Sequence, residues 1–309
     1  MEQEQEEEIS LKRFLKWATE LGITDSGTTN PSPVEPISCL GHSLFVSHFP
    51  DAGGRGLGAA RDLIKGELIL RVPRSALMTS ESLLRHDHSL SLALTNHPSL
   101  SSTQILGVCL LAEVGKGKNS WWYPYLMQLP RSYDTLAAFG SFERQALQVD
   151  YAIWAAEKAT CKAECEWKEA APLMKELNLK PHLLSFKAWL WVSSTISSRT
   201  MHVPWDEAGC LCPVGDFFNY AAPGEDIYQY GAPCSQRHAS SSPEECSLWD
   251  GDATGKLEED DAHMQRLTDG CYDEALGSYC FYARRNYKKG EQVIDFLDII
   301  YGSISLSVF

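Results

Sequence analysis

A block of helical spacing interrupts a run of short strand patterns, and this order limits the folds open to the chain. From residue 39 to residue 78, short apolar stretches alternate with turn-forming residues, as in β-strands. Between about residues 80 and 200, apolar residues recur at the spacing of amphipathic helices, and strand patterns return from Cys210 to Val293. The order predicts an α+β protein in which a small domain of short antiparallel strands carries a helical insertion.

Local signals mark the individual elements. A glycine-rich stretch at residues 53–58 separates two strand patterns and is typical of a turn. Apolar residues at helical spacing follow Ser10, which can cap a helix, and Gly22 can end it. We find no internal repeat. The expected strands are residues 43–49 and 68–72, and the expected helices are residues 10–21, 104–114, 142–168 and 185–199.

These signals divide the 309 residues into consecutive parts. Two strand-rich parts flank the helical block, and the second contains a polar, acidic stretch that we expect to be a surface loop. The expected parts are an acidic leader (1–9), a helix and loop (10–38), the first strand-rich part (39–79), the helical insertion (80–200), the second strand-rich part (201–302) with its acidic loop (235–269), and a tail (303–309).

Composition and charge exclude several classes of protein. Hydrophobic residues make up 44% of the chain, which is enough for a packed core and excludes a disordered chain. The formal net charge of -14 argues against a protein that neutralises nucleic-acid phosphates, and it fits a basic partner such as a lysine-rich peptide. No apolar run reaches the roughly 18 residues of a membrane span. We expect a monomer that binds neither nucleic acid nor membrane.

The ten cysteines and the acidic start bear on the compartment. Residues 1–8 lack the basic and then apolar pattern of a secretory or organellar leader. We therefore expect free thiols in a reducing compartment, the cytoplasm or the nucleus, with the chloroplast still open.

Several short sequence elements follow one another in a recognisable order. The first, GRGLGAARDLIKGE at residues 54–67, contains glycines that let backbone groups approach a ligand closely. The others are FLKW (14–17), WYPYLMQLP (122–130), WVSSTISSR (191–199), PVGDFFNY (213–220) and YARRNYKKGEQV (282–293). Together they resemble SET-domain protein N-methyltransferases of the Rubisco-methyltransferase-like branch, and the chain is similar to plant SET domain group proteins.

This resemblance implies an α+β fold of the SET type and a pocket for S-adenosylmethionine. The guanidinium of Arg199 would hold the cofactor's carboxylate with two hydrogen bonds. Plainer interpretations stay open, since Arg199 can be a helix-end cation, and Asp216 and Asn219 can be turn residues. The cofactor-binding residues that the resemblance implies are Gly53, Gly54, Arg55, Gly56, Ser198, Arg199, Asp216, Asn219 and Tyr220.

The implied reaction moves a methyl group from the cofactor to a side-chain nitrogen of a protein substrate, with lysine as the default acceptor and histidine as the alternative. A lysine amine has a pKa near ~10.4 and must lose a proton before transfer. Aromatic walls suit a channel for such a nitrogen. The candidate catalytic tyrosines are Tyr228 and Tyr230, which follow the Asn219 element, and Tyr301.

The sequence departs from the family pattern in two places. Tyr220 stands where the family usually has histidine. Near the end, Leu297 holds the position of the family's closing tyrosine, and Tyr301 comes four residues later. We expect the family's C-terminal helical domain, which helps to dock substrate, to be absent. We interpret the chain as a truncated or alternatively ended form and expect weak or no activity.

Three alternatives accompany this interpretation. The fold could serve as a non-catalytic module that binds a partner peptide, which the atypical ending favours. A zinc site could use Cys210 and Cys212 with Cys161 and Cys165, or Cys234 and Cys246, but these pairs lack the repeated spacing of structural zinc sites, and we expect no metal. A hydrolase is disfavoured because the chain has neither a G-x-S-x-G nor an H-E-x-x-H element.

Overall fold

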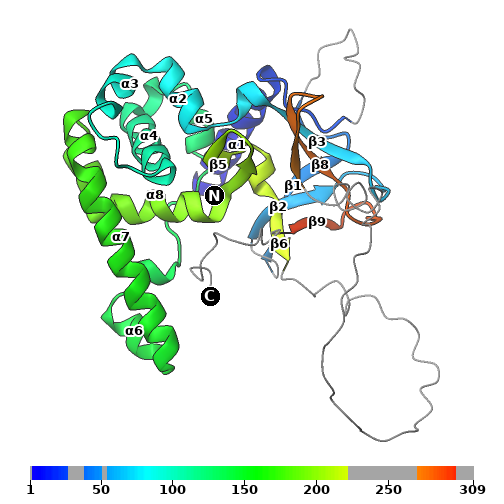
Figure 1. The fold of residues 1–309 in the computed structure, drawn as a ribbon. Helices are drawn as coiled ribbons and strands as arrows, with labels where there is room; N and C mark the ends of the chain where they lie inside the picture. Colours follow the sequence, from blue (N-terminus) through cyan, green and yellow to red (C-terminus); the bar gives the residue numbers. More distant parts are fainter. Residues whose placement is uncertain (1, 27–37, 51–53, 222–269, 297–309) are drawn as a thin grey trace, which may run out of the picture.

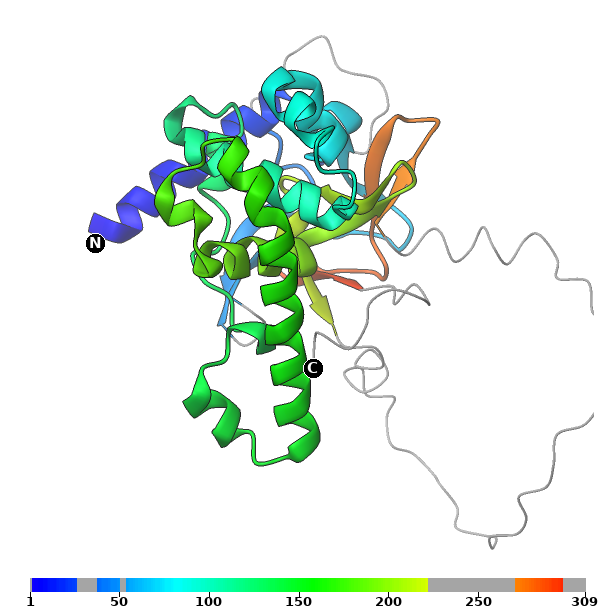
Figure 2. The same cartoon turned by 60° about the vertical axis from the view of Figure 1, so that its left-hand side comes forward.

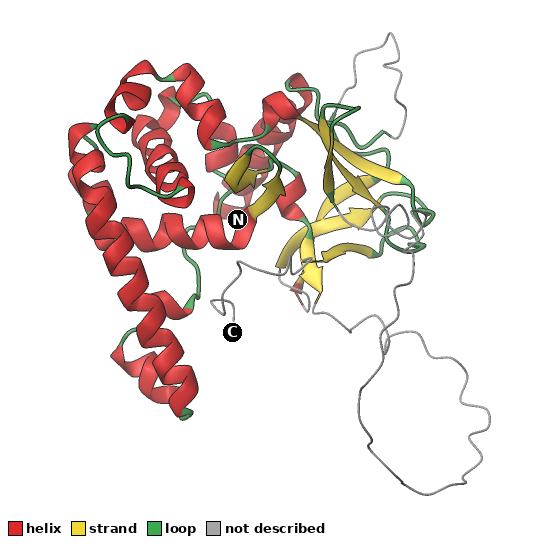
Figure 3. Ribbon diagram, in the orientation of Figure 1, coloured by secondary structure: helices red, strands yellow, loops and turns green. Residues whose placement is uncertain are grey.

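The computed structural model describes residues 2–26, 38–50, 54–221 and 270–296, and it places a helical half beside a strand-rich half (Figures 1 and 3). The α-helices are α1 (Glu2–Glu20), α2 (Ser80–His86), α3 (His88–Leu94), α4 (Ser102–Lys116), α5 (Tyr123–Leu126), α6 (Ser141–Ala146), α7 (Asp150–Glu176) and α8 (Phe186–Arg199). The strands are β1 (Leu44–Phe49), β2 (Gly54–Ala59), β3 (Leu68–Pro73), β4 (Thr200–Val203), β5 (Asp206–Leu211), β6 (Asn219–Ala221), β7 (Cys271–Asp273), β8 (Ser278–Tyr282) and β9 (Gln292–Phe296). The α+β class is confirmed.

The described strands form three small sheets. The largest has the order β1-β2-β9-β6, the second has the order β3-β8-β7, and β4 pairs with β5. β1 and β2 form an antiparallel hairpin from Leu44 opposite Ala59 to Phe49 opposite Gly54. β6 instead runs parallel to β9, with Asn219 opposite Ile294. Antiparallel pairing was therefore predicted correctly for every pair except this one.

The glycine-rich stretch is a strand, so the prediction of a turn at residues 53–58 is wrong for the part from Gly54 onward. A Cβ atom on Gly58 would lie 2.7 Å from the ring of Phe45 on β1. A Cβ atom on Gly56 would lie 2.7 Å from Nδ2 of Asn219. These glycines are needed because neighbouring side chains cover the strand, rather than because the backbone turns there.

Two helix boundaries also differ from the prediction. α1 begins at Glu2, so Ser10 lies inside the helix instead of capping it. The Ser10 hydroxyl accepts a hydrogen bond from Gln128 Nε2 at 2.9 Å. The expected helix at residues 142–168 is divided into α6 and α7, because Gln148 has a left-handed backbone with φ of 57° between them.

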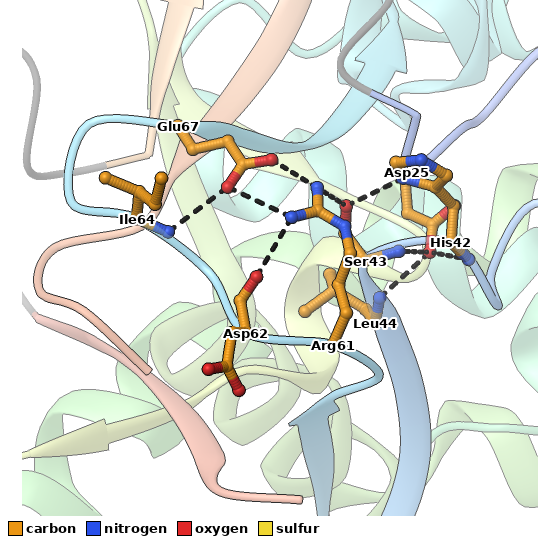
Figure 4. A network of polar contacts seen from close by, with 8 residues as sticks. All are labelled: Asp25, His42, Ser43, Leu44, Arg61, Asp62, Ile64 and Glu67. Carbon is orange, nitrogen blue, oxygen red and sulfur yellow. Dashed lines mark hydrogen bonds and ion pairs between the residues drawn. The ribbon is translucent and has the colours of Figure 1, made fainter. Parts of the chain in front are cut away.

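A buried carboxylate ties the segment after α1 to the start of β1 (Figure 4). Asp25, 3% exposed, accepts backbone hydrogen bonds through Oδ2 from Gly41, His42, Ser43 and Leu44, at 2.7 to 2.9 Å. Four donors replace the water that a buried carboxylate would lose, so the charge is satisfied without a cation. The contact fixes where β1 begins.

Two surface turns, residues 61–67 and 285–291, repeat one another, and we call them the twin turns. Their sequences are RDLIKGE and RNYKKGE, which share an arginine, a lysine, a glycine and a glutamate. In each, the first arginine pairs with the last glutamate. In each, the penultimate glycine has a positive φ, 82° for Gly66 and 90° for Gly290.

The twin turns also cap each other. Leu63 and Tyr287 exchange both backbone hydrogen bonds, at 2.9 and 3.0 Å. Asp62 Oδ1 accepts from the backbone of Lys289, and Asn286 Oδ1 accepts from the backbone of Lys65. These reciprocal bonds hold the turn before β3 against the turn before β9.

The helical half is built around α4, which α7 and α8 contact. Close approach is possible because Gly107 on α4 lies against the ring of Trp189 on α8, 3.5 Å from where a Cβ would be. α7 forms the outer edge of this half, and its whole length faces the viewer in Figure 2. No helix in the described ranges has the length and apolar character needed to cross a lipid bilayer.

Candidate functional site

A buried ion pair lies where the helical half meets the strand-rich half. Arg199 is the last residue of α8, and Asp216 lies in a single 3-10 turn, Gly215–Phe217. Arg199 Nη1 donates to Asp216 Oδ2 and to the Asp216 carbonyl, both at 3.0 Å. The side chains are 18% and 1% exposed. Burial opposes the charge of Arg199, but the Asp216 carboxylate outweighs it, and the pKa of the guanidinium is raised.

Two tyrosines form hydrogen bonds with this ion pair. The Tyr125 hydroxyl donates to Asp216 Oδ2 at 2.9 Å, and Arg199 Nε donates to the Tyr133 hydroxyl at 3.2 Å. Complete burial raises the pKa of Tyr125, and the charge of Asp216 raises it further. Tyr125 therefore keeps its proton and acts as a donor to the carboxylate.

One oxygen and one nitrogen of the ion pair have no partner among the described residues. Asp216 Oδ1 is buried without a hydrogen bond. Arg199 uses Nε and Nη1 in its bonds, which leaves Nη2 without one in the same part of the chain. A buried oxygen of this kind is costly unless a donor reaches it. The pair thus has room for one further acceptor and one further donor.

Arg55 on β2 lies beside this pair. Its Nη1 donates to Gln128 Oε1 at 3.0 Å, and its Nη2 donates to the Gln128 carbonyl at 2.6 Å. Its guanidinium carbon lies 4.2 Å from the centre of the Phe217 ring. Burial lowers the pKa of Arg55, while the charge of Asp216 opposes that change. Gln128, which follows α5, and Phe217 in the 3-10 turn hold Arg55 in place. Arg55 thus extends the polar cluster around Arg199 and Asp216 toward β2.

Asn219 brings the start of β6 to the same place. It begins β6, and its side-chain nitrogen would be 2.7 Å from a Cβ on Gly56. Gln292 on β9 would be 3.0 Å from that Cβ. The predicted residues from β2, α8 and the PVGDFFNY element therefore converge on one region.

Comparison with known proteins finds relatives over most of the chain. Protein SET DOMAIN GROUP 40 of Arabidopsis thaliana is 58% identical over 288 residues, which are 93% of this chain and 55% of that protein. The human actin-histidine N-methyltransferase is 29% identical over 219 residues, which are 67% of this chain and 33% of that enzyme. The chain thus spans about half or less of the length of these relatives. No family model matches the sequence.

Solved structures share the fold. The SET domain of LSMT bound to lysine and AdoHcy superposes with a TM-score of 0.64 at 16% identity, over 94% of this chain and 53% of that one. Rubisco LSMT bound to sinefungin and monomethyllysine gives a TM-score of 0.60 at 17% identity, with the same coverage.

The chain has the SET-domain fold.

The structure positions the other predicted site residues of this SET domain as follows. Ser198 is exposed, and its hydroxyl donates to the Ser194 carbonyl at 2.6 Å, an ordinary intrahelical bond. Gly54 begins β2 with φ of 87°. Tyr220 pairs with Asp295 through the backbone of β6, and its side chain lies outside the described part. Gly53, Tyr228, Tyr230 and Tyr301 lie outside the described residues.

Sequence reasoning missed three residues of the polar cluster around Arg199 and Asp216, namely Tyr125, Gln128 and Tyr133. The first two belong to the element WYPYLMQLP, which contributed to the family resemblance but suggested only an aromatic structural segment. The tyrosine at residue 125 and the glutamine three residues later are the signal that could have been used, since both are polar groups in an otherwise apolar element.

The cysteines proposed for zinc do not assemble in the described part of the SET domain. Cys210 and Cys212 are buried, whereas Cys161 and Cys165 are exposed on α7. No three histidine, cysteine or acidic side chains within the described ranges form a group that could hold a metal ion. Burial raises the pKa of Cys210, so this thiol remains protonated. Cys234 and Cys246 lie outside the described residues.

Proposed function

We propose that this chain is an S-adenosylmethionine-dependent protein N-methyltransferase, with lysine as the default acceptor and histidine as the alternative. The observation that carries the proposal is the convergence of β2, α8 and the 213–220 element around the buried pair Arg199–Asp216. The relatives support it, because one is an actin-histidine N-methyltransferase and the Rubisco LSMT structures hold AdoMet, AdoHcy or sinefungin.

The residues present fit an amino-acid-like ligand. S-adenosylmethionine carries a carboxylate and an ammonium on its methionine portion. Arg199 Nη2 is a free donor among the described residues, and Asp216 Oδ1 is a buried acceptor without a partner there. A guanidinium held by a carboxylate and a tyrosine is already oriented, so binding an anion costs little further ordering. Gly56 keeps the strand beside Asn219 free of a side chain.

When bound, the cofactor supplies a methyl group activated by a positive sulfur. The protein's contribution is to orient the donor, exclude water and accept a neutral nitrogen. Arg199 and Asp216 would fix the methionine portion, while Tyr125 and Tyr133 keep both charged groups in place. Tyr228 or Tyr230 remains the predicted aromatic wall of the nitrogen channel, and Tyr301 remains a predicted catalytic tyrosine.

Binding and transfer are tested separately. Calorimetric titration with S-adenosylmethionine is expected to detect binding, and sinefungin is expected to compete. Arg199→Ala is expected to weaken binding at least tenfold, about 1.4 kcal/mol, because the carboxylate loses its cation. Arg285→Ala, which removes a partly exposed arginine of the second twin turn, is the matched control and is expected to bind normally.

Transfer is measured with labelled cofactor and two acceptors, a lysine-rich protein pool and actin. Mass spectrometry of the products identifies the modified residue and separates lysine from histidine. Binding without any transfer would favour the non-catalytic module. Neither binding nor transfer would contradict the proposed function.

A further inference from the structure

The outer face of α7 has a second, largely apolar stripe whose side chains are exposed in the described part of the chain. The inner face carries the buried residues of the helix, among them Ala156, Ala163 and Ala170. On the opposite face, five residues follow one another at steps of three, four, three and four. These residues, which we call the α7 seam, are Tyr151, Trp154, Lys158, Cys161 and Cys165.

The α7 seam is open to solvent. Tyr151 is 58% exposed and Trp154 is 51% exposed, and both cysteines are exposed. Val149, directly before the helix, is 57% exposed and continues the apolar surface. In Figures 1 and 2, α7 lies on the outside of the helical half. A surface helix normally has one apolar face, so two such faces indicate a helix that is covered on both sides when a partner is present.

The first three side chains of the seam already contact one another. The rings of Tyr151 and Trp154 are 5.7 Å apart, and Lys158 Nζ lies 4.8 Å from the Trp154 ring. Side chains that already contact one another lose little conformational freedom when a partner covers them. Steps of three and four residues are the spacing with which one helix packs along another. The occupant that fits is therefore a helix with an apolar face.

The charges beside the α7 seam indicate which kind of helix would bind there. Asp150, Glu157 and Glu164 each stand directly before a seam residue and form an acidic flank along one side. Asp150 and Glu157 make no ion pair with the described residues, whereas Glu164 pairs with Lys168 at 3.5 Å. Residues at this position face the flanking residues of a partner helix, so the partner needs basic residues there.

A second copy of this chain fits less well. In an antiparallel pair the acidic flank would face another acidic flank, which repels. In a parallel pair Glu157 would meet Lys162, but Glu164 would meet Glu169. We propose that the α7 seam binds a basic amphipathic helix of a partner protein. This surface is separate from the candidate site and from its proposed chemistry.

The test uses the full chain and three synthetic peptides of equal length. One has leucines at steps of three and four with flanking lysines, one has flanking glutamates instead, and one has the composition of the first in scrambled order. Calorimetry is expected to detect binding of the first peptide and binding at least tenfold weaker for the other two. The scrambled peptide controls for general attraction to a chain with a net charge of -14.

Two variants locate the contact. Trp154→Ala is expected to weaken binding at least tenfold, and Glu157→Lys several-fold. Trp121→Ala, which removes a 53% exposed indole elsewhere, and Glu274→Lys, in the turn between β7 and β8, are matched controls that are expected to bind normally. Circular dichroism checks that each variant is folded.

A second measurement uses the seam's own thiols. The lysine-flanked peptide is expected to slow alkylation of Cys161 and Cys165, read separately from the other cysteines by peptide mapping. Equal binding of the ordered and scrambled peptides, no binding of any peptide, or binding that Trp154→Ala leaves intact would overturn the proposal. So would a concentration-dependent dimer that Trp154→Ala abolishes, since a second copy would then occupy the seam.

Discussion

Arginine–carboxylate pairs occur both in the twin turns and in the candidate site, but they differ in exposure and therefore in what they contribute to stability. In the twin turns the paired side chains are 27% to 36% exposed. In the candidate site Asp216 is 1% exposed and Arg199 is 18% exposed. Water screens the charges of the twin-turn pairs, so these pairs fix the shape of the turns but add little to the free energy of unfolding. The pair in the candidate site is strongly coupled, because removing either partner leaves a buried charge alone.

The largest effect is expected from Asp216→Ala. It would leave Arg199 without its carboxylate and Tyr125 without its acceptor. We expect the free energy of unfolding to fall by about 3–5 kcal/mol, the usual cost of breaking a buried pair. Urea denaturation followed by tryptophan fluorescence measures it. A loss similar to that of a twin-turn variant would contradict the contrast between the two regions.

A smaller loss is expected from Tyr125→Phe. The substitution keeps the ring and removes only the hydroxyl that donates to Asp216. Hydrogen bonds to charged groups contribute about 1.5–3 kcal/mol, so the variant should lie between Asp216→Ala and the surface variants. The same denaturation experiment measures it, with Tyr123→Phe on the neighbouring residue as control. No change in stability would mean that water replaces the hydroxyl.

The twin-turn arginines should have the smaller effects. Arg61→Ala and Arg285→Ala are each expected to lower the free energy of unfolding by about 1 kcal/mol or less. Arg61→Ala should cost more, because Arg61 also donates to the Ser43 hydroxyl at 3.0 Å, next to the Asp25 contact (Figure 4). Measuring both variants side by side tests the order. The reverse order would show that the stacking of Arg285 on Tyr287 is the stronger contact.

The smallest effect is a pH dependence in the first twin turn. The hydrogen bond from Arg61 lowers the pKa of Glu67 below its ordinary value of 4.5. A carboxylate with a lowered pKa in the folded state contributes stability above its ordinary pKa, and that contribution is lost as the pH falls through the folded value. The difference in stability between the native chain and Arg61→Ala should therefore shrink below about pH 4.5. A difference that stays constant down to pH 3 would contradict this.

The sequence was sufficient for elements whose signals are local. The helix that ends at Arg199 was predicted from its apolar spacing, and the structure shows Ser185 as its cap. The family elements identified Arg55, Arg199, Asp216 and Asn219 as neighbours, and they do converge. Their assigned contacts with a cofactor remain predictions.

The contacts that build the site could not be predicted, because they join distant residues. Tyr125 and Asp216 are 91 positions apart, and Arg55 and Gln128 are 73 positions apart. No local pattern indicates which polar side chains meet across such distances. The glycines of β2 were misread for a similar reason, since what excludes a side chain at Gly56 is Asn219, a residue far along the chain.

The position of β9 has a consequence for how the molecule is made. The last described strand lies inside its sheet, between β2 and β6, rather than at an edge. During synthesis β6 emerges long before the strand it must pair with, and β2 earlier still. The half of the protein that contains Asn219 can therefore be completed only after residue 296 has left the ribosome. Assembly of this sheet should be slow and should come late, because it closes long loops.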